Sequence, residues 1–246
     1  MLGAHAGGSI CRLMNKLSVY EFKRRALSVF FPNICPFCGR VIDARDYYCE
    51  SCRELLPLIN GELPPPENVS RLYACCWYSG IARAAVHMLK FKCLIYPADM
   101  FGLMMSRVLK DVKADALVPV PSGFLSIEKR GFSPAAVIAE RVSMRLGIPI
   151  LNALTADFDK TEQKTLTRKS RILNARKCFH ISKNVSVRGK RLLIIDDVTT
   201  TGSTLSALAE ILLNAGAADV SAAVFAQVPG SIKRPEEPKR YKPKRK

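Results

Sequence analysis

The apolar positions of this chain follow two different spacings. Short, nearly continuous apolar runs are typical of buried strands, and we expect strands over residues 72–78, 118–120, 148–151, 192–195 and 220–225. Elsewhere apolar residues recur every three or four positions, which predicts helices over residues 16–31, 81–92, 134–146 and 205–214. Strands that alternate with helices favour a parallel sheet covered by helices, so the predicted fold class is α/β.

A chemically distinctive segment follows the apolar run at 192–195. It holds two adjacent carboxylates and a hydroxyl-rich turn, and its candidate binding residues are Asp196, Asp197, Thr199, Thr200, Thr201, Gly202, Ser203 and Thr204. In an open α/β sheet, ligands bind at the carboxyl ends of the strands. A helix N-terminus there offers unpaired N–H groups to a phosphate, and carboxylates accept hydrogen bonds from sugar hydroxyls. The segment therefore suits a ligand with a ribose diol and a 5′-phosphate. A purely structural alternative is a helix cap, because Thr and Ser are ordinary capping residues, but it does not explain the paired acids.

Two CxxC pairs form the second signal. Cys35 and Cys38 precede Cys49 and Cys52, and each pair offers two thiolates from one tight turn, which is typical of a tetrahedral zinc site. Four protein ligands leave no open position, so the predicted zinc is structural. The alternatives are disulfides and a redox CxxC. Disulfides are rare in a reducing compartment, and a redox site needs one CxxC and not two.

Composition limits the class of protein. At 48% hydrophobic and 24% charged residues, the 246-residue chain can build a core. It has no run of 18 apolar residues, so we expect no membrane span. The N-terminus does not resemble a signal peptide, and Met14 is an alternative start. Nine cysteines without such a signal favour a cytoplasmic location.

The net charge of +17 is unevenly distributed. Residues 160–191 hold eleven Lys or Arg and one acid, and the last fourteen residues hold eight basic residues and two acids. This tail also contains three prolines and few apolar residues, so we expect it to be disordered. Basic surfaces attract polyanions, which favours nucleic acid as a partner; the alternative is a solvated basic face.

These features resemble the ComF family of competence proteins, over roughly residues 27–226. Besides the cysteine pairs and the acidic loop, the marks are Phe30-Phe31-Pro32, Trp77-Tyr78-Ser79-Gly80, Leu89-Lys90-Phe91-Lys92, Val118-Pro119-Val120-Pro121, Lys129-Arg130-Gly131-Phe132, Thr161-x-Gln163, Leu166, Arg171, Asn174 and Phe179. The chain departs from the family where Ser133-Pro134 replaces an Asn-Gln pair, and where Ala156 and Asp157 occupy a region in which an Arg is common. Ser133 and Pro134 remain suitable as N-cap and first residue of a helix.

The resemblance implies a type I phosphoribosyltransferase-like open parallel sheet with helices on both faces, preceded by a small four-cysteine zinc module. We divide the chain into a helix and zinc module at 1–60, a linker at 61–70, the phosphoribosyltransferase-like domain at 71–230 and the basic tail at 231–246. The implied ligand is phosphoribosyl pyrophosphate (PRPP) with magnesium. Residues 118–122 then correspond to the pyrophosphate loop, with a rigid proline turn as the alternative. The basic residues Lys164, Arg168, Lys169 and Arg171 correspond to a lid over the substrate, with a DNA-facing or solvated loop as the alternative.

The implied function leaves two classes open. One is a DNA-uptake protein that binds PRPP, single-stranded DNA and proteins of the uptake machinery. The other is an active transferase with an unidentified acceptor. Thr200 stands where several purine enzymes have an Asp, which disfavours purine salvage.

Overall fold

A computed structural model describes residues 17–59, 62–156 and 178–230. Its centre is a five-stranded sheet in the order β1-β2-β7-β6-β3. The strands are β1 (Glu62–Leu63), β2 (Leu72–Trp77), β3 (Ala116–Pro119), β6 (Arg191–Thr199) and β7 (Asp219–Gln227). The four longer strands pair in parallel, and β1 adds a short antiparallel edge. The prediction of an α/β fold built on a parallel sheet is confirmed, with this antiparallel edge as the exception.

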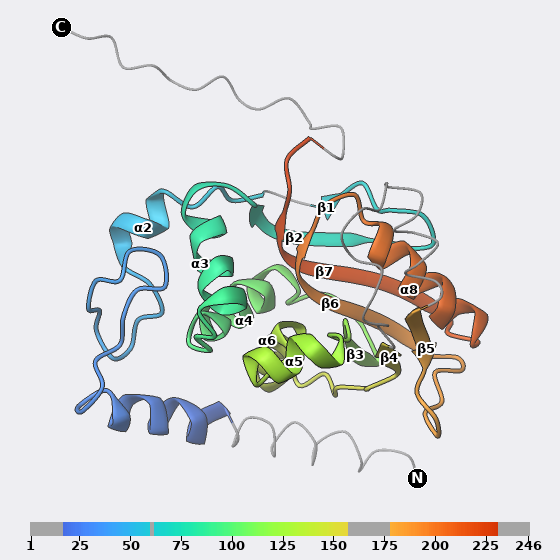
Figure 1. Ribbon diagram of the computed structural model, residues 1–246, viewed down its shortest axis with the longest axis horizontal. Helices are drawn as coiled ribbons and strands as arrows, with labels where there is room; N and C mark the ends of the chain where they lie inside the picture. Colours follow the sequence, from blue (N-terminus) through green and yellow to red (C-terminus); the bar gives the residue numbers. More distant parts are fainter. Residues whose placement is uncertain (1–16, 60–61, 157–177, 231–246) are drawn as a thin grey trace, which may run out of the picture.

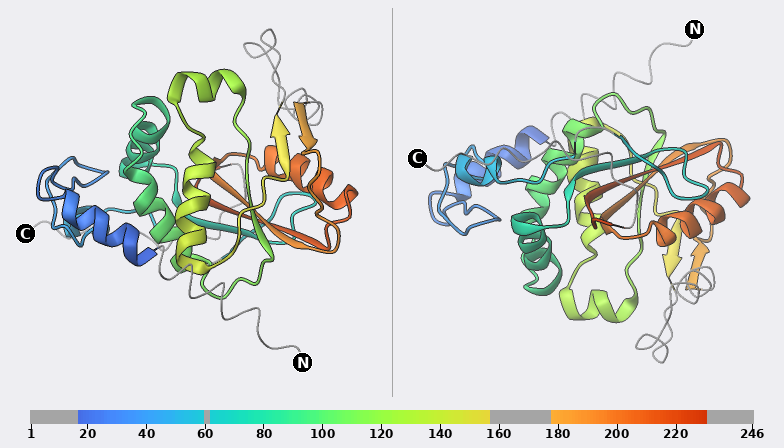
Figure 2. Two further views of the ribbon diagram at one scale, coloured as in Figure 1. Left: turned by 90° about the horizontal axis from the view of Figure 1, so that it is seen from below. Right: turned by 90° about the horizontal axis from the view of Figure 1, so that it is seen from above.

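Helices cover both faces of the sheet (Figures 1 and 2). They are α3 (Gly80–Phe91), α4 (Pro97–Val108), α5 (Phe124–Arg130), α6 (Pro134–Leu146) and α8 (Ser203–Asn214). Residues of α3, α4 and α6 share one hydrophobic cluster with one face of the sheet, whereas α8 packs with the opposite face. A separate antiparallel pair, β4 (Leu154–Ala156) and β5 (Phe179–Ile181), also belongs to the cluster on the α8 side.

The apolar run of β6 explains why the sheet needs cover on both faces. Successive side chains of a strand point to opposite faces. Leu193 and Ile195 accordingly lie in the cluster of α3, α4 and α6, and Leu192 and Ile194 lie in the cluster of α8. All four are at most 1% exposed. This double burial anchors β6 directly before the two acids, Asp196 and Asp197, which lie in its carboxyl-terminal half.

The helix predicted over 134–146 is confirmed and ends at Gly147, whose φ of 74° is the left-handed conformation that favours glycine. Ser133 is its N-cap residue, but no side-chain cap bond forms, since the Ser133 hydroxyl lies 3.0 Å from that of Ser122. The strand predicted over 148–151 is wrong, because only one parallel bridge forms there, between Leu117 and Ile150. Helices α4 and α5 were not predicted.

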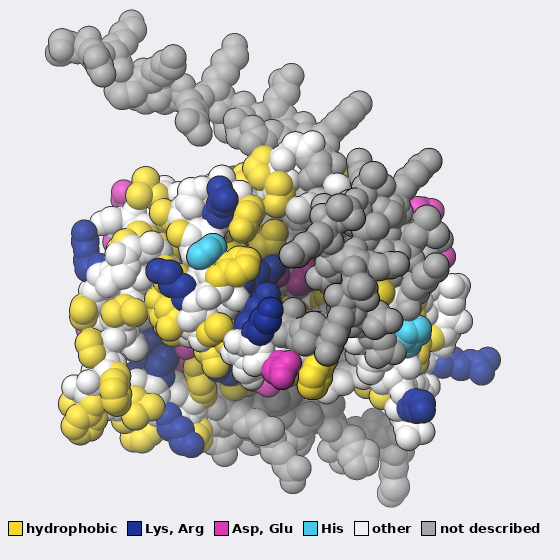
Figure 3. All heavy atoms as spheres, in the orientation of Figure 1, with side chains coloured by type: hydrophobic (Ala, Val, Ile, Leu, Met, Phe, Trp, Pro, Cys, Tyr) yellow, Lys and Arg dark blue, Asp and Glu magenta, His cyan; other side chains and the backbone are white. Residues whose placement is uncertain are grey.

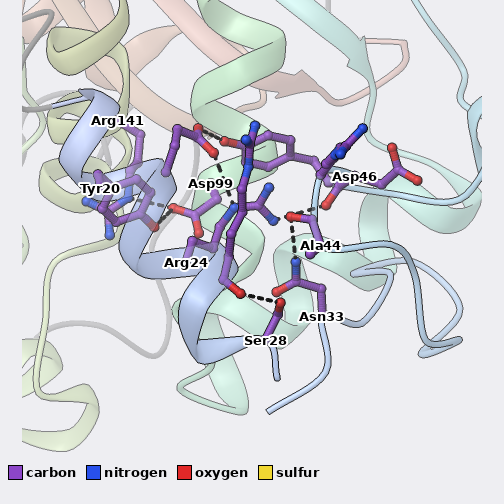
Figure 4. A network of polar contacts seen from close by, with 12 residues as sticks. Tyr20, Arg24, Ser28, Asn33, Ala44, Asp46, Asp99 and Arg141 are labelled. Carbon is purple, nitrogen blue, oxygen red and sulfur yellow. Dashed lines mark hydrogen bonds and ion pairs between the residues drawn. The ribbon is translucent and has the colours of Figure 1, made fainter. Parts of the chain in front are cut away.

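The N-terminal helix covers residues 17–27 and joins the cysteine segment to the rest of the protein (Figure 4). The Tyr20 hydroxyl donates to Asp99 of α4 at 2.5 Å, and Arg141 of α6 donates to the same carboxylate at 2.6 Å. Arg24 donates to the backbone carbonyl of Asp46 at 3.1 Å. The Arg141 guanidinium also lies 4.6 Å from the Tyr20 ring, so the helix contacts two core helices and the cysteine segment.

Candidate functional site

The acidic pair lies at the carboxyl end of β6, and the hydroxyl-rich turn leads from it into α8. The predicted binding residues therefore form one continuous stretch around the end of a central strand and the first turn of a helix. Asp197 and Thr199 are buried, Asp196 is partly buried, and Thr200 is exposed. The site thus combines largely buried carboxylates with a neighbouring hydroxyl-bearing loop that reaches the surface.

The two oxygens of Asp197 have different surroundings. Oδ1 accepts the Val198 N–H at 2.8 Å and forms an ion pair with Nζ of Lys90 at 2.9 Å. Oδ2 is buried and has no hydrogen-bond partner among the described residues. A buried carboxylate oxygen without a donor is costly. This atom is therefore the point of the site best suited to a donor supplied by a ligand.

Charge and burial shift the pKa values of the cluster. Burial and the neighbouring negative charge of Asp197 raise the pKa of Asp196 well above its ordinary value, while Lys90 opposes that rise. Burial lowers the pKa of Lys90, but Asp197 and Asp196 more than offset this effect, so the pKa lies above its ordinary value. Lys90 is therefore a cation at neutral pH, and the acidic pair has its charge partly balanced.

The hydroxyl-rich loop has a defined shape. Gly202 has a φ of 75° and accepts the Ser206 N–H at 2.8 Å through its carbonyl, which opens α8. The N-cap residue of α8 is Gly202, which has no side chain to cap the helix. Gln227, at the end of β7, donates from Nε2 to the Thr200 carbonyl at 2.6 Å. The loop is therefore anchored from the neighbouring strand, and the N-terminus of α8, where N–H groups lack partners within the helix, lies beside it.

The segment after β3 lies beside the acidic strand. The Val120 N–H donates to the Ile195 carbonyl at 2.9 Å, one residue before Asp196. The predicted pyrophosphate loop, residues 118–122, thus starts next to the acidic pair. Carboxylate oxygens are the ligands that a hard cation such as magnesium prefers. The Asp197 Oδ2 atom, which accepts no hydrogen bond from the described residues, therefore fits a sugar phosphate that carries magnesium.

The four paired cysteines converge. The Sγ atoms of Cys35, Cys38, Cys49 and Cys52 all lie within 4.8 Å of one another, and those of Cys38 and Cys49 are 3.7 Å apart. A tetrahedral site with zinc–sulfur bonds of about 2.3 Å places its sulfurs roughly 3.8 Å apart, so the cluster could hold zinc. Cys49 precedes α2 (Glu50–Glu54), which carries Cys52. Burial and the neighbouring thiols raise the pKa of Cys52.

Basic and hydrophobic side chains mix on the surface over α3 and α5 (Figure 3). The Phe91 side chain is 63% exposed, its ring centroid lies 4.7 Å from that of His87, and the Arg130 guanidinium lies 6.0 Å from the Phe91 ring. Next to it is a hollow of about 360 Å³ lined by Gly80, Arg83, Ala84, His87, Met88 and Lys92. We call the side chains of His87, Phe91 and Arg130, together with this hollow, the α3–α5 surface. Exposed rings flanked by cations suit stacked bases and phosphates.

Comparison with known proteins identifies the class. The family model described as "Phosphoribosyl transferase domain" matches residues 115–245, more than half of the chain, and the chain belongs to that family. It is also similar to "Competence protein ComFC" of Bacillus subtilis, with 29% identity over 80% of this chain and 79% of that protein. "DNA utilization protein YhgH" of Salmonella typhi is 28% identical over 80% of this chain and 91% of its own. "Competence protein F" of Haemophilus influenzae is 24% identical, over 75% and 82%. The resemblance to the competence proteins is confirmed.

Two contacts at the site were missed by sequence reasoning. Gln227 gave no signal, because it is a single polar residue at a strand end. Lys90 lies in the motif Leu89-Lys90-Phe91-Lys92, which marked the resemblance but suggested no partner. The predicted lid residues Lys164, Arg168, Lys169 and Arg171 and the basic tail lie outside the described residues. Among the described helices, none has the length and apolarity needed to cross a bilayer.

Proposed function

We propose that this protein binds PRPP with magnesium at the β6–α8 site and handles single-stranded DNA during DNA uptake. The observation that carries PRPP binding is the buried Asp197 Oδ2, for which the described residues offer no hydrogen-bond donor, next to a helix N-terminus whose N-cap residue is glycine. A ribose hydroxyl would supply the missing donor. The N–H groups at the start of α8, together with Thr200, Thr201, Ser203 and Thr204, would hold the 5′-phosphate.

The chain's own residues define what happens to such a ligand. Asp196 and Asp197 orient the ribose diol and stabilise positive charge that develops at the anomeric carbon as pyrophosphate departs. The contact of segment 118–122 with the acidic strand supports its proposed role in holding the pyrophosphate. Magnesium, when bound with the ligand, neutralises charge on the phosphates.

The DNA partner rests on three observations. The relatives include proteins named "Competence protein" and "DNA utilization protein". The net charge is +17, concentrated in 160–191 and the tail. The α3–α5 surface adds an exposed aromatic ring with cations beside it. Zinc in the cysteine cluster would be structural, since four thiolates leave no open position.

Calorimetric titration of the purified protein with PRPP tests the site. We expect binding that needs magnesium and that weakens about tenfold or more in Asp197→Asn, because a charge-assisted hydrogen bond is lost. Asp111→Asn is the matched control, since the Asp111 side chain is 88% exposed and distant in sequence from the site. A folded Asp197→Asn variant that binds PRPP as tightly as the unmodified protein would show that Asp197 does not contact PRPP.

A second candidate is an active transferase with an unidentified acceptor, favoured by membership of the phosphoribosyl transferase domain family. Incubation with PRPP and magnesium, with and without single-stranded DNA, separates the two functions. Pyrophosphate release above that of the Asp197→Asn variant supports a transferase. PRPP binding without release supports a binding role.

A further inference from the structure

Lys90 lies in the last turn of α3, far in the sequence from the acidic loop, yet it makes the only ion pair to Asp197 among the described residues. The Nζ–Oδ1 distance is 2.9 Å. The lysine side chain is 28% exposed, whereas that of Asp197 is 3% exposed. The ammonium group therefore links a buried carboxylate to the open side of the site.

We infer that Lys90 is a positioning residue for PRPP: it fixes Asp197 by Oδ1, so that Oδ2 stays available to the ribose, and it offsets the charge of the acidic pair against an anionic ligand. This inference rests on the proposed PRPP site. It assigns a new role to the motif Leu89-Lys90-Phe91-Lys92, which the binding loop itself does not use.

The geometry supports the orienting part. Oδ1 is held by two donors, Lys90 Nζ and the Val198 N–H, from two different elements. Two donors on one oxygen restrict rotation of the carboxylate and fix where Oδ2 lies. Without Lys90, the backbone N–H alone would hold the group, and the two oxygens could exchange places.

Electrostatics supports the charge part. PRPP is a polyanion, and two adjacent carboxylates repel it. Lys90 interacts with both Asp197 and Asp196, and burial makes such interactions stronger than in water. A cation at this position therefore reduces the repulsion between the two carboxylates that hold the ribose diol and the phosphate groups of the same ligand.

The alternative is that Lys90 only neutralises a buried charge and stabilises the fold. The two roles differ in what they predict for binding. A stabilising residue changes the unfolding temperature but leaves PRPP affinity intact in the folded protein. A positioning residue changes affinity mainly through Asp197, so most of its effect is lost when Asp197 is replaced.

The test measures PRPP–magnesium affinity and thermal unfolding of the full chain in matched variants. Lys90→Met should lower affinity about tenfold, as expected for a lost charge-assisted bond, and Lys90→Arg should recover it to within about threefold. Lys110→Met removes the same charge from a side chain that is 74% exposed and belongs to neither proposed binding surface, and should leave affinity unchanged. If Lys90→Met does not fold, Lys90→Gln keeps a donor to Asp197 and removes the charge, and should still lose affinity.

The Asp197→Asn background decides the mechanism. There, adding Lys90→Met should lower affinity by clearly less than tenfold, because the orienting contact to Asp197 is already lost and only the charge offset to Asp196 remains. A folded Lys90→Met or Lys90→Gln protein with the affinity of the unmodified chain overturns the inference, and so does a full tenfold loss in the Asp197→Asn background. Absence of PRPP binding by the unmodified chain would instead reject the proposed function itself.

Discussion

Pro66 packs directly against Gly202. A Cβ atom added to Gly202 would lie 2.7 Å from Cβ and 2.8 Å from Cγ of Pro66. The proline-rich segment before β2 therefore closes over the loop that precedes α8. Gly202 is needed there twice, once for its φ of 75° and once for the close approach of Pro66.

Replacing Gly202 by Ala should consequently distort the loop. We expect the free energy of unfolding to fall by about 1–3 kcal/mol and PRPP affinity to fall about tenfold, because the N–H groups at the start of α8 move. Gly189→Ala is the control. Gly189 has a similar φ of 70° but open space around its Cβ position, so it should cost stability alone. Chemical denaturation and calorimetry measure the two effects, and an unchanged Gly202→Ala protein would contradict the role of this contact.

We expect Asp196 to destabilise the folded protein at neutral pH when no ligand is bound. Its folded-state pKa is raised, first by burial and then by Asp197, so its contribution favours the folded protein at low pH and is lost as pH rises through that pKa. Asp196→Asn should therefore unfold at a higher temperature than the unmodified chain at neutral pH. The advantage should shrink as pH falls below the pKa of Asp196. Thermal unfolding from pH 4 to pH 8 checks this, and a lower unfolding temperature for Asp196→Asn at neutral pH would contradict it.

The cysteine cluster should hold one metal ion. Freshly purified, reduced protein should contain about one zinc per chain, and Cys49→Ser should lose it and destabilise the N-terminal segment. Cys93→Ser is the control, since Cys93 is exposed and outside the cluster. Metal analysis of both variants decides the matter; zinc retained at the full level in Cys49→Ser would exclude that ligand.

DNA binding should depend on salt. If basic side chains contact phosphates, the logarithm of the affinity for a labelled single strand should fall linearly with the logarithm of salt concentration, with a slope of about 0.7 per phosphate neutralised. Deleting residues 233–246 should make the slope shallower and leave PRPP binding unchanged. Fluorescence anisotropy from low to physiological salt measures both. If the protein binds no single strand even at low salt, its basic residues only interact with solvent and the proposed DNA role is wrong.

Local chemistry made much of the site predictable. The acidic pair and the hydroxyl-rich loop are contiguous, and the strand and helix beside them have clear apolar patterns, so their arrangement follows from local rules. The paired cysteines were equally readable, because each CxxC turn brings two thiols together. Helix α5 was missed because it is short, and the strand at 148–151 was wrong because a single bridge does not make a strand.

The sequence by itself determined the α/β class, the position of the acidic loop and the candidate metal ligands. Tertiary structure decided which distant residues complete them: Lys90 from α3 against Asp197, Gln227 from β7 on the Thr200 carbonyl, and Pro66 on Gly202. Local patterns show on which face of its own helix or strand a residue lies. The partner that it meets depends on how the helices and strands pack together, and this packing is set by the burial of both faces of β6 and its neighbours.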